Sequence, residues 1–305
     1  MLKMTGKKKA GLQRMPVLFI CVCVLPTLIL TLLFTVIPTL RALWMSLFDS
    51  TALGMNSTFI GIENYLYMFQ DDKFLQALGN TFKLLAVVPV ITIVFALILA
   101  FMLSQTKLRE RGLYRTVFYF PNIISLTVVG IIWSFVFHPN MGIVNSLLKF
   151  VGLDALARPW VGDAKTALWC IAVTLVWQAT GYYMIMHMAA KDGISNEIYE
   201  AATIDGASSF RKFISITVPL MSDIIGITFV LAMSGTMNLS FTLSKVMTGG
   251  GPNGASKVLL QYMYEQGFMN GNFGYAMAIT VFSLTISVIL SMISRRLSNR
   301  EEDKK

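Results

Sequence analysis

The sequence predicts an all-α, polytopic membrane protein that crosses the bilayer six times. Of its 305 residues, 55% are hydrophobic and only 13% are charged, whereas about a quarter of the residues in a soluble domain are charged. The apolar residues also come in runs of about 20, the length that a helix needs to cross about 30 Å of hydrocarbon. Basic residues stand mainly at the ends of these runs, where the chain returns to water.

Six apolar segments define the expected spans. They lie at about 16–47, 81–104, 113–137, 166–190, 219–240 and 273–294. The first follows a basic segment, as in a signal peptide, but it is too long for one and has no small-residue cleavage site, so we expect a retained span. Prolines within or near the spans kink helices, which suits a moving bundle, although static membrane proteins contain them as well.

The distribution of Lys and Arg predicts the orientation. On the side of both chain ends, the tails and loops carry five, four, three and five basic residues, 17 together, whereas the opposite side carries 6. Because basic residues accumulate on the cytoplasmic side, both termini are expected there, N-in and C-in. The expected domains are a cytoplasmic basic tail (1–15), a transmembrane domain (16–294) and a cytoplasmic tail (295–305).

Two stretches between the spans have helical apolar spacing, at 71–78 and 145–151. Both predict short helices that lie on the outer surface of the membrane. A third stretch, 249–257, is rich in Gly but lacks the Gly-Lys-Ser/Thr order of a phosphate loop. It is expected to form a flexible outer turn that does not bind ATP.

Several other kinds of chemistry are disfavoured by the residue types. The three cysteines, Cys21, Cys23 and Cys170, fall inside apolar stretches, which favours buried hydrophobic side chains over a disulfide or a metal site. The chain has only two histidines, so few side chains are available for a His-based zinc site or a Ser-His-Asp arrangement. The basic residues form no stripe with interleaved aromatics, as nucleic-acid binding would require. We therefore expect no catalytic residue, no cofactor and no metal.

The loop between the fourth and fifth spans, 191–218, is too polar to cross the membrane and too regular to be a linker. Small and apolar residues recur at helical intervals, and Gly206 can end one helix and let the chain turn into another. We expect a short helix, a turn and a second short helix. Small side chains let such a helix sit close in a partner's groove, and a carboxylate can meet an Arg or Lys there.

This loop resembles the EAA loop of binding-protein-dependent ABC import permeases. That pattern has Glu-Ala-Ala, a Gly four residues after the last Ala, and Ile and Leu-Pro further on, and the matches are Glu200, Ala201, Ala202, Gly206, Ile216 and Pro219. Val218 stands where Leu is usual. The resemblance implies a coupling helix that docks on a cytoplasmic ATPase, with Asp205 among the docking residues.

Other marks along the chain resemble the maltose-type carbohydrate permeases. They lie at 61–65, 120–121, 142–145, 177–178 and 248–252. The resemblance implies a bacterial inner-membrane subunit of an ABC importer for a sugar or sugar-like solute. The implied partners are a second homologous permease subunit, a cytoplasmic ATP-binding-cassette ATPase dimer and an extracytoplasmic solute-binding protein, within membrane lipid.

Neutral polar and aromatic residues of the fourth and fifth spans are the expected substrate path. They are Trp177, Gln178, Tyr182, Asn238 and Ser240. Hydroxyls of an uncharged polyol need donors and acceptors, and the faces of a sugar stack on rings. Hydrogen bonds between helices are the alternative use of the same side chains.

Two other classes of protein stay open. An ion-coupled secondary carrier needs a buried acid or broken helices at the midplane and usually an internal repeat, and the sequence predicts none of these. A structural or assembly protein of the membrane would leave the loop at 191–218 without a purpose. Co-purification with an ATPase would separate the permease from both.

Overall fold

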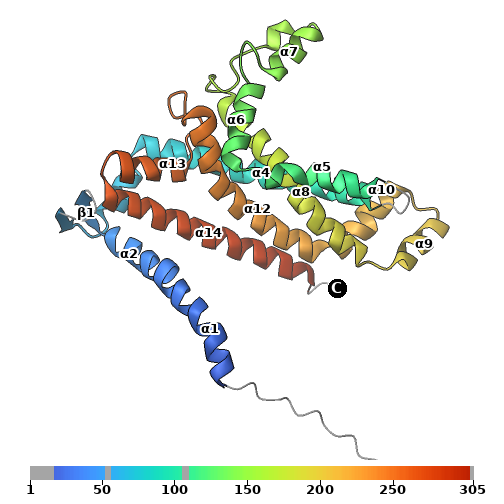
Figure 1. The fold of residues 1–305 in the computed structure, drawn as a ribbon, viewed down its shortest axis with the longest axis horizontal. Helices are drawn as coiled ribbons and strands as arrows, with labels where there is room; N and C mark the ends of the chain where they lie inside the picture. Colours follow the sequence, from blue (N-terminus) through green and yellow to red (C-terminus); the bar gives the residue numbers. More distant parts are fainter. Residues whose placement is uncertain (1–16, 52–55, 105–109, 303–305) are drawn as a thin grey trace, which may run out of the picture.

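The computed structural model describes residues 17–51, 56–104 and 110–302, and it shows a bundle of long helices (Figure 1). The bundle is built from α4 (Asp72–Leu103), α8 (Ala167–Asp192), α12 (Ser222–Leu243) and α14 (Phe273–Glu302). Helix α4 packs along α8 and against α12, which also packs on α14. Five described helices are long and apolar enough to cross a membrane, and a bent pair makes a sixth if it counts as one span.

Buried apolar side chains fill the contacts between these helices. One group, around Leu84 and Ile171, joins α4 to α8, and a second, around Met184, continues that contact along the bundle. A third group, around Phe74 and Ile279, joins α4 to α14. The fourth, fifth and sixth predicted spans begin within a few residues of α8, α12 and α14, so these spans are confirmed as helices.

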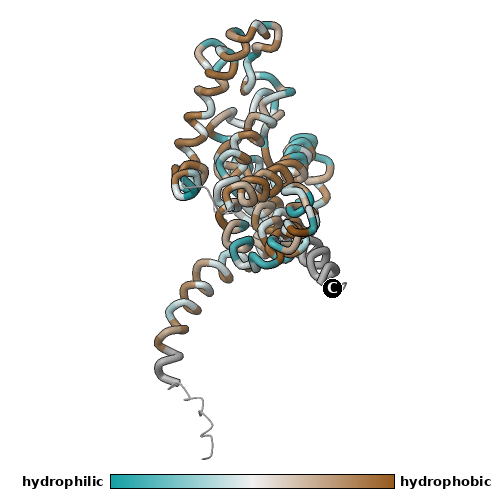
Figure 2. Tube along the Cα trace, turned by 90° about the vertical axis from the view of Figure 1, so that its right-hand side faces the viewer, coloured by the Kyte–Doolittle hydropathy of each residue, from teal (hydrophilic) through white to brown (hydrophobic). Residues whose placement is uncertain are grey.

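The first predicted span leaves the bundle. It consists of α1 (Val17–Thr31), the π-helix η1 (Leu32–Val36) and α2 (Ile37–Met45), and its apolar window from Val22 is 0% buried. Figure 2 shows the α1 end of this span, with its apolar residues in brown, standing away from the rest of the chain, whereas α2 packs against α14. Cys23 is consequently exposed, whereas Cys170 is buried as predicted.

The all-α prediction needs a correction, because the chain contains a small β-hairpin. Strands β1 (Phe48–Thr51) and β2 (Asn56–Phe59) pair antiparallel, with Phe48 opposite Phe59. The hairpin lies against the start of α14, where a Cβ on Gly274 would be 1.9 Å from the Phe48 carbonyl oxygen. Only glycine allows this approach. The short helix α3 (Glu63–Met68) follows the hairpin.

The predicted surface helix at 71–78 was wrong as a separate element. Those residues are the first turns of α4, which runs without a break through the second predicted span. Asp71 begins the helix, because its carboxylate accepts from the backbone N–H of Lys73 at 3.0 Å and of Phe74 at 3.4 Å.

The third predicted span is broken, contrary to the expectation of no broken helix. Its halves, α5 (Arg111–Ile123) and α6 (Leu126–Val136), are bent by 99°. The chain is extended at the C-cap of α5, Ile124, and Pro121 removes a backbone donor just before it. Helix α6 leads away from the bundle to α7 (Ile143–Phe150), the second predicted short helix (Figure 1).

Candidate functional site

The EAA-like loop folds as predicted into a helix, a turn and a second helix. Helix α9 (Asn196–Ile204) and helix α10 (Ser209–Lys212) stand at the end of the bundle farthest from the hairpin (Figure 1). Ser195 and Ser208 cap them, each with a side chain that accepts from a backbone N–H of the first turn.

Gly206 sets the turn between these helices. Its φ is +73°, in the left-handed region that glycine adopts without strain. The N–H of Gly206 donates to the Thr203 carbonyl at 3.0 Å, and the N–H of Ala207 donates to the Ala202 carbonyl at 2.9 Å. This pair of bonds is a Schellman motif, which ends α9 and satisfies its last carbonyls.

The tip of the loop is a mixed polar and apolar surface. Glu200, Ala201 and Asp205 are exposed, and Ala202 is half-buried. Two large apolar side chains are exposed as well, Ile204 at 87% and Phe210 at 74%. Exposed apolar groups beside a carboxylate suit a protein partner better than water.

Pro219 lies where the loop returns to the bundle. It follows the π-helix η4 (Phe213–Thr217) and stands inside the short helix α11 (Val218–Leu220), just before α12. Proline lacks a backbone N–H, so the helix here widens and one carbonyl needs another donor. Earlier in the same segment, the buried Thr217 hydroxyl donates to the Lys212 carbonyl at 3.3 Å.

The three predicted path residues of α8 face different surroundings. The ring of Trp177 is 40% exposed, lies 5.5 Å from the ring of Trp133 and lines an apolar groove of about 760 Å³ between α4, α5, α6 and α8. Gln178 is buried, and its Oε1 has no hydrogen-bond partner among the described residues. Tyr182 is 39% exposed, with its ring against that of Tyr183.

The two predicted path residues of α12 also differ. Asn238 is exposed, with its Nδ2 donating to the Ser234 carbonyl at 2.9 Å. Ser240 is buried and donates to the Met237 carbonyl at 3.0 Å. Within the described residues, no hydrogen bond or ring contact joins the α8 group to the α12 group, so the five positions do not form one pocket in this single chain.

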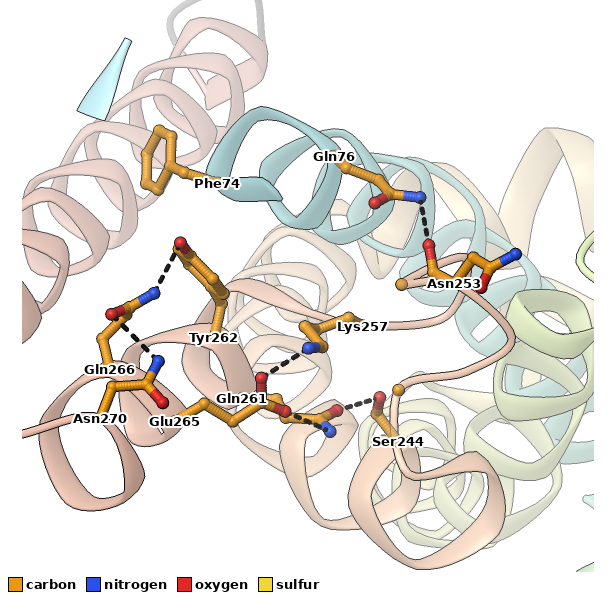
Figure 3. A network of polar contacts seen from close by, with 12 residues as sticks. Phe74, Gln76, Ser244, Asn253, Lys257, Gln261, Tyr262, Glu265, Gln266 and Asn270 are labelled. Carbon is orange, nitrogen blue, oxygen red and sulfur yellow. Dashed lines mark hydrogen bonds and ion pairs between the residues drawn. The ribbon is translucent and has the colours of Figure 1, made fainter. Parts of the chain in front are cut away.

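At the opposite end, a network of polar side chains holds the segment after α12 (Figure 3). Lys257 pairs with Glu265 at 2.5 Å, and Gln261 bridges Glu265 and Ser244. Asn80 of α4 donates to the carbonyls of residues 254 and 257, both at 3.0 Å. The segment 249–257 was predicted to be a flexible turn, but these bonds fix it to α4 and to Glu265, the residue that follows α13 (Leu259–Tyr264).

A carboxylate joins this network to the start of α4. The Tyr262 hydroxyl donates to the same Asp71 oxygen as the Tyr275 hydroxyl does, the latter at 2.8 Å. Burial and the neighbouring Asp71 raise the pKa of Tyr262, so its hydroxyl stays protonated and keeps donating. Gln266, in the π-helix η6 (Glu265–Met269), donates to the Tyr262 oxygen at 2.7 Å.

Comparison with known proteins identifies the chain. Residues 92–302 match the family described as the inner membrane component of binding-protein-dependent transport systems. The chain belongs to this family. As an inner-membrane component it is a multi-pass protein of the bacterial inner membrane, and the family is one of transport subunits, not of enzymes.

Relatives of this inner-membrane component align with it over most of their length. The probable ABC transporter permease protein YurN of Bacillus subtilis is 37% identical, over 87% of this chain and 91% of that protein. The lactose transport system permease protein LacF of Rhizobium radiobacter is 34% identical, over 88% of this chain and 90% of that protein. A crystal structure of a bacterial ABC transporter that imports alginate contains a chain of the same fold, with a TM-score of 0.81 and 22% identity over 93% of this chain and 96% of that one.

The structure adds residues of this inner-membrane component that sequence reasoning missed. Lys245 extends the exposed face of α12 beyond Asn238, in the π-helix η5 (Ser244–Thr248), and its ammonium lies 3.9 Å from the ring centre of Tyr264. Tyr183 lies near α12, because its hydroxyl is 3.7 Å from where a Gly235 Cβ would be. Periodicity on α12 could have indicated Lys245, but nothing in the sequence pairs Tyr183 with Gly235.

Proposed function

We propose that this inner-membrane component imports a neutral, sugar-like solute and is driven by ATP hydrolysis on a separate ATP-binding-cassette dimer. The observation that carries the proposal is the exposed α9–α10 loop, with Glu200, Ala201 and Gly206 at its surface and turn. A relative named for lactose transport, aligned over most of its length, supports the class of solute.

The α9–α10 loop is the proposed ATPase dock. The expected contacts are the exposed Glu200, Ala201 and Asp205, with Ala202 on the flank of the helix. The two large exposed side chains at the tip would be desolvated on docking, which favours association by removing apolar surface from water. Gly206 fixes the turn, and Pro219 fixes the return to the bundle.

The proposed orientation places this loop and both chain ends in the cytoplasm. The basic asymmetry of 17 to 6 supports it. The fold is consistent in one respect: the α9 end and the end with the hairpin lie at opposite ends of the long helices (Figure 1). The polar network around Lys257 would then face the outside, where a solute-binding protein delivers the cargo.

The proposed solute path runs along α12 beside a second, homologous permease subunit. Asn238 is exposed on this face and lies in the same helical stripe as Ser234. Amides and hydroxyls serve neutral hydroxyl groups, whereas a charged solute would need a fixed counter-charge in the low-dielectric bundle. Lys245 extends the same face but lies beyond α12, with its ammonium over the Tyr264 ring, so the stretch at Ser234 and Asn238 itself offers no counter-charge. Trp177, Gln178 and Tyr182 of α8 would complete the path if the partner subunit or a different transport state brings the two faces together.

Two substitutions test the two parts of the proposal in a reconstituted complex with its ATPase and binding protein. Glu200→Arg reverses an exposed charge, so membrane insertion should be normal while solute-stimulated ATPase activity is lost. Normal stimulation would remove the docking assignment.

Asn238→Leu keeps the approximate volume but removes the donor and the acceptor, so uptake should fall while ATPase docking persists. Ser240→Ala is the companion variant, because Ser240 is buried and bonded within its own helix. Unchanged uptake in both variants would show that these groups only bond within their own helix and that the path lies elsewhere.

A further inference from the structure

Tyr199, the residue before Glu200, contacts the segments that join α9 to the bundle. Its side chain is half-buried, and its hydroxyl lies 2.9 Å from the Thr217 hydroxyl of η4. The Lys191 ammonium lies over its ring, 4.9 Å from the ring centre. Within the described residues, it is the one α9 side chain whose hydrogen bonds and ring contacts reach α8, since Thr203 bonds to Lys212 of the neighbouring α10 instead.

Lys191 extends this contact to two helices of the bundle. It belongs to the last turn of α8, and its ammonium donates to the Ser104 carbonyl at the end of α4, at 3.5 Å. The ring of Phe101, also on α4, lies 6.0 Å from the same ammonium. A single cation therefore joins the ring of Tyr199 to the ends of α4 and α8.

Thr217 extends the other contact toward α12. Its side chain is 1% exposed, and its hydroxyl both contacts Tyr199 and donates to the Lys212 carbonyl. It stands at the end of η4, two residues before Pro219, where the helical hydrogen-bond ladder is already altered. Movement of the Tyr199 hydroxyl therefore moves the segment that leads into α12.

We propose that Tyr199 is the positioning residue that transmits movement of the coupling loop to the membrane helices. Its hydroxyl acts on α12 through Thr217, and its ring acts on α8 and α4 through Lys191. The assignment rests on the proposed function, because it presumes that an ATPase moves α9. A rigid ring held on two sides passes displacement between packed elements, which a flexible exposed side chain cannot do.

The test measures moles of solute imported per mole of ATP hydrolysed in the reconstituted complex. Tyr199→Phe removes the hydroxyl and keeps the ring, and Thr217→Val removes the other hydroxyl. Each should lower the ratio about two- to tenfold, the range that loss of one hydrogen bond supports. The double variant should lose no more than Thr217→Val alone, because Thr217→Val already removes the contact with the Tyr199 hydroxyl, along with its own bond to the Lys212 carbonyl.

Conservative replacements separate transmission from folding. Thr217→Ser keeps the hydroxyl and should restore the ratio. Tyr65→Phe is the matched control, because it removes a tyrosine hydroxyl that donates to the Ser46 hydroxyl at 2.8 Å near the hairpin, at the opposite end of the bundle. Its ratio should equal that of the wild type.

Three outcomes overturn the proposal. One is an unchanged ratio in both Tyr199→Phe and Thr217→Val, even if their thermal stability falls, because the contact would then be structural. The second is an equal loss in Tyr65→Phe, and the third is no recovery in Thr217→Ser. Failure of the underlying function is distinguishable, since the wild-type complex itself would then show no ATP-dependent uptake.

Discussion

Gly206 holds the turn of the α9–α10 loop in a conformation that other residues adopt only with strain. Its φ is +73°, and a Cβ there would meet no atom within 4 Å, so alanine adds backbone strain without a clash. The left-handed conformation costs an L-residue about 1–2 kcal/mol. That cost lowers the population of the native turn roughly 5- to 30-fold.

A series of three substitutions grades this effect. Asn tolerates the left-handed region and should cost least, and Ala should cost the full amount. Pro should prevent the turn, because its φ is fixed near about −65° and it lacks the N–H that donates to the Thr203 carbonyl. All three variants should insert normally, while solute-stimulated ATPase activity of the reconstituted complex falls in the order Asn, Ala, Pro.

Gly152→Ala is the control for general strain. Gly152 has a φ of +76° and also no atom within 4 Å of an added Cβ, but it follows α7, away from the loop. Its ATPase stimulation should remain that of the wild type. Wild-type stimulation in Gly206→Pro would refute the reasoning, and so would an equal loss in Gly152→Ala.

Further predictions concern orientation and packing. The variant Ser208→Cys should react with an impermeant reagent only from the cytoplasmic side. The variant Phe150→Cys, at a position where the native side chain is 88% exposed, should react only from outside. Labelling of Ser208→Cys in intact cells would overturn the topology. Gly181→Ala should lower the free energy of unfolding by about 1–3 kcal/mol, because its Cβ would lie 1.8 Å from the Phe118 carbonyl oxygen. Gly79→Ala, whose Cβ would have no atom within 4 Å, should leave that free energy unchanged. Equal stabilities of the two variants would contradict the close packing. Tyr262→Phe should lower the free energy of unfolding by about 1–3 kcal/mol, because the hydroxyl that donates to Asp71 is lost. An unchanged melting temperature would argue against a stabilising role of this bond.

The long, uniformly apolar segments were predictable because a single physical requirement decides them. A helix that crosses hydrocarbon must satisfy its own backbone and present apolar side chains, so α8, α12 and α14 follow from run length. The α9–α10 loop was predictable for a local reason, since Gly206 and its neighbours encode a Schellman turn within a few residues.

Features that depend on contacts distant in sequence were not predictable. The break between α5 and α6 combines a local signal, Pro121, with packing against Gly181, which is 60 residues away. The hairpin depends on the fit of Phe48 against Gly274. A polar segment such as 249–257 reads as a loose turn until its partners on α4 are known.

The docking positions and the path positions of the predicted site differ in how far the sequence determines their arrangement. The docking positions from Glu200 to Gly206 lie together because they follow one another along α9 and its C-terminal turn, whereas Pro219 lies apart, at the return to the bundle. The path positions were chosen by residue type, and type alone does not give the face of a helix: Asn238 is exposed, whereas Ser240, two residues later, points into the bundle. The position of a second permease subunit, which no single-chain sequence encodes, decides which exposed face lines the path.

ATP-dependent uptake by proteoliposomes tests the central claim most directly. The complex of this chain with its permease partner, ATPase and binding protein would be reconstituted, and a panel of labelled neutral sugars and charged analogues supplied with the binding protein. We predict uptake of a neutral sugar that requires ATP on the ATPase side and persists when all ion gradients are collapsed. Uptake that needs an ion gradient and no ATP, or that accepts only charged solutes, would contradict the account.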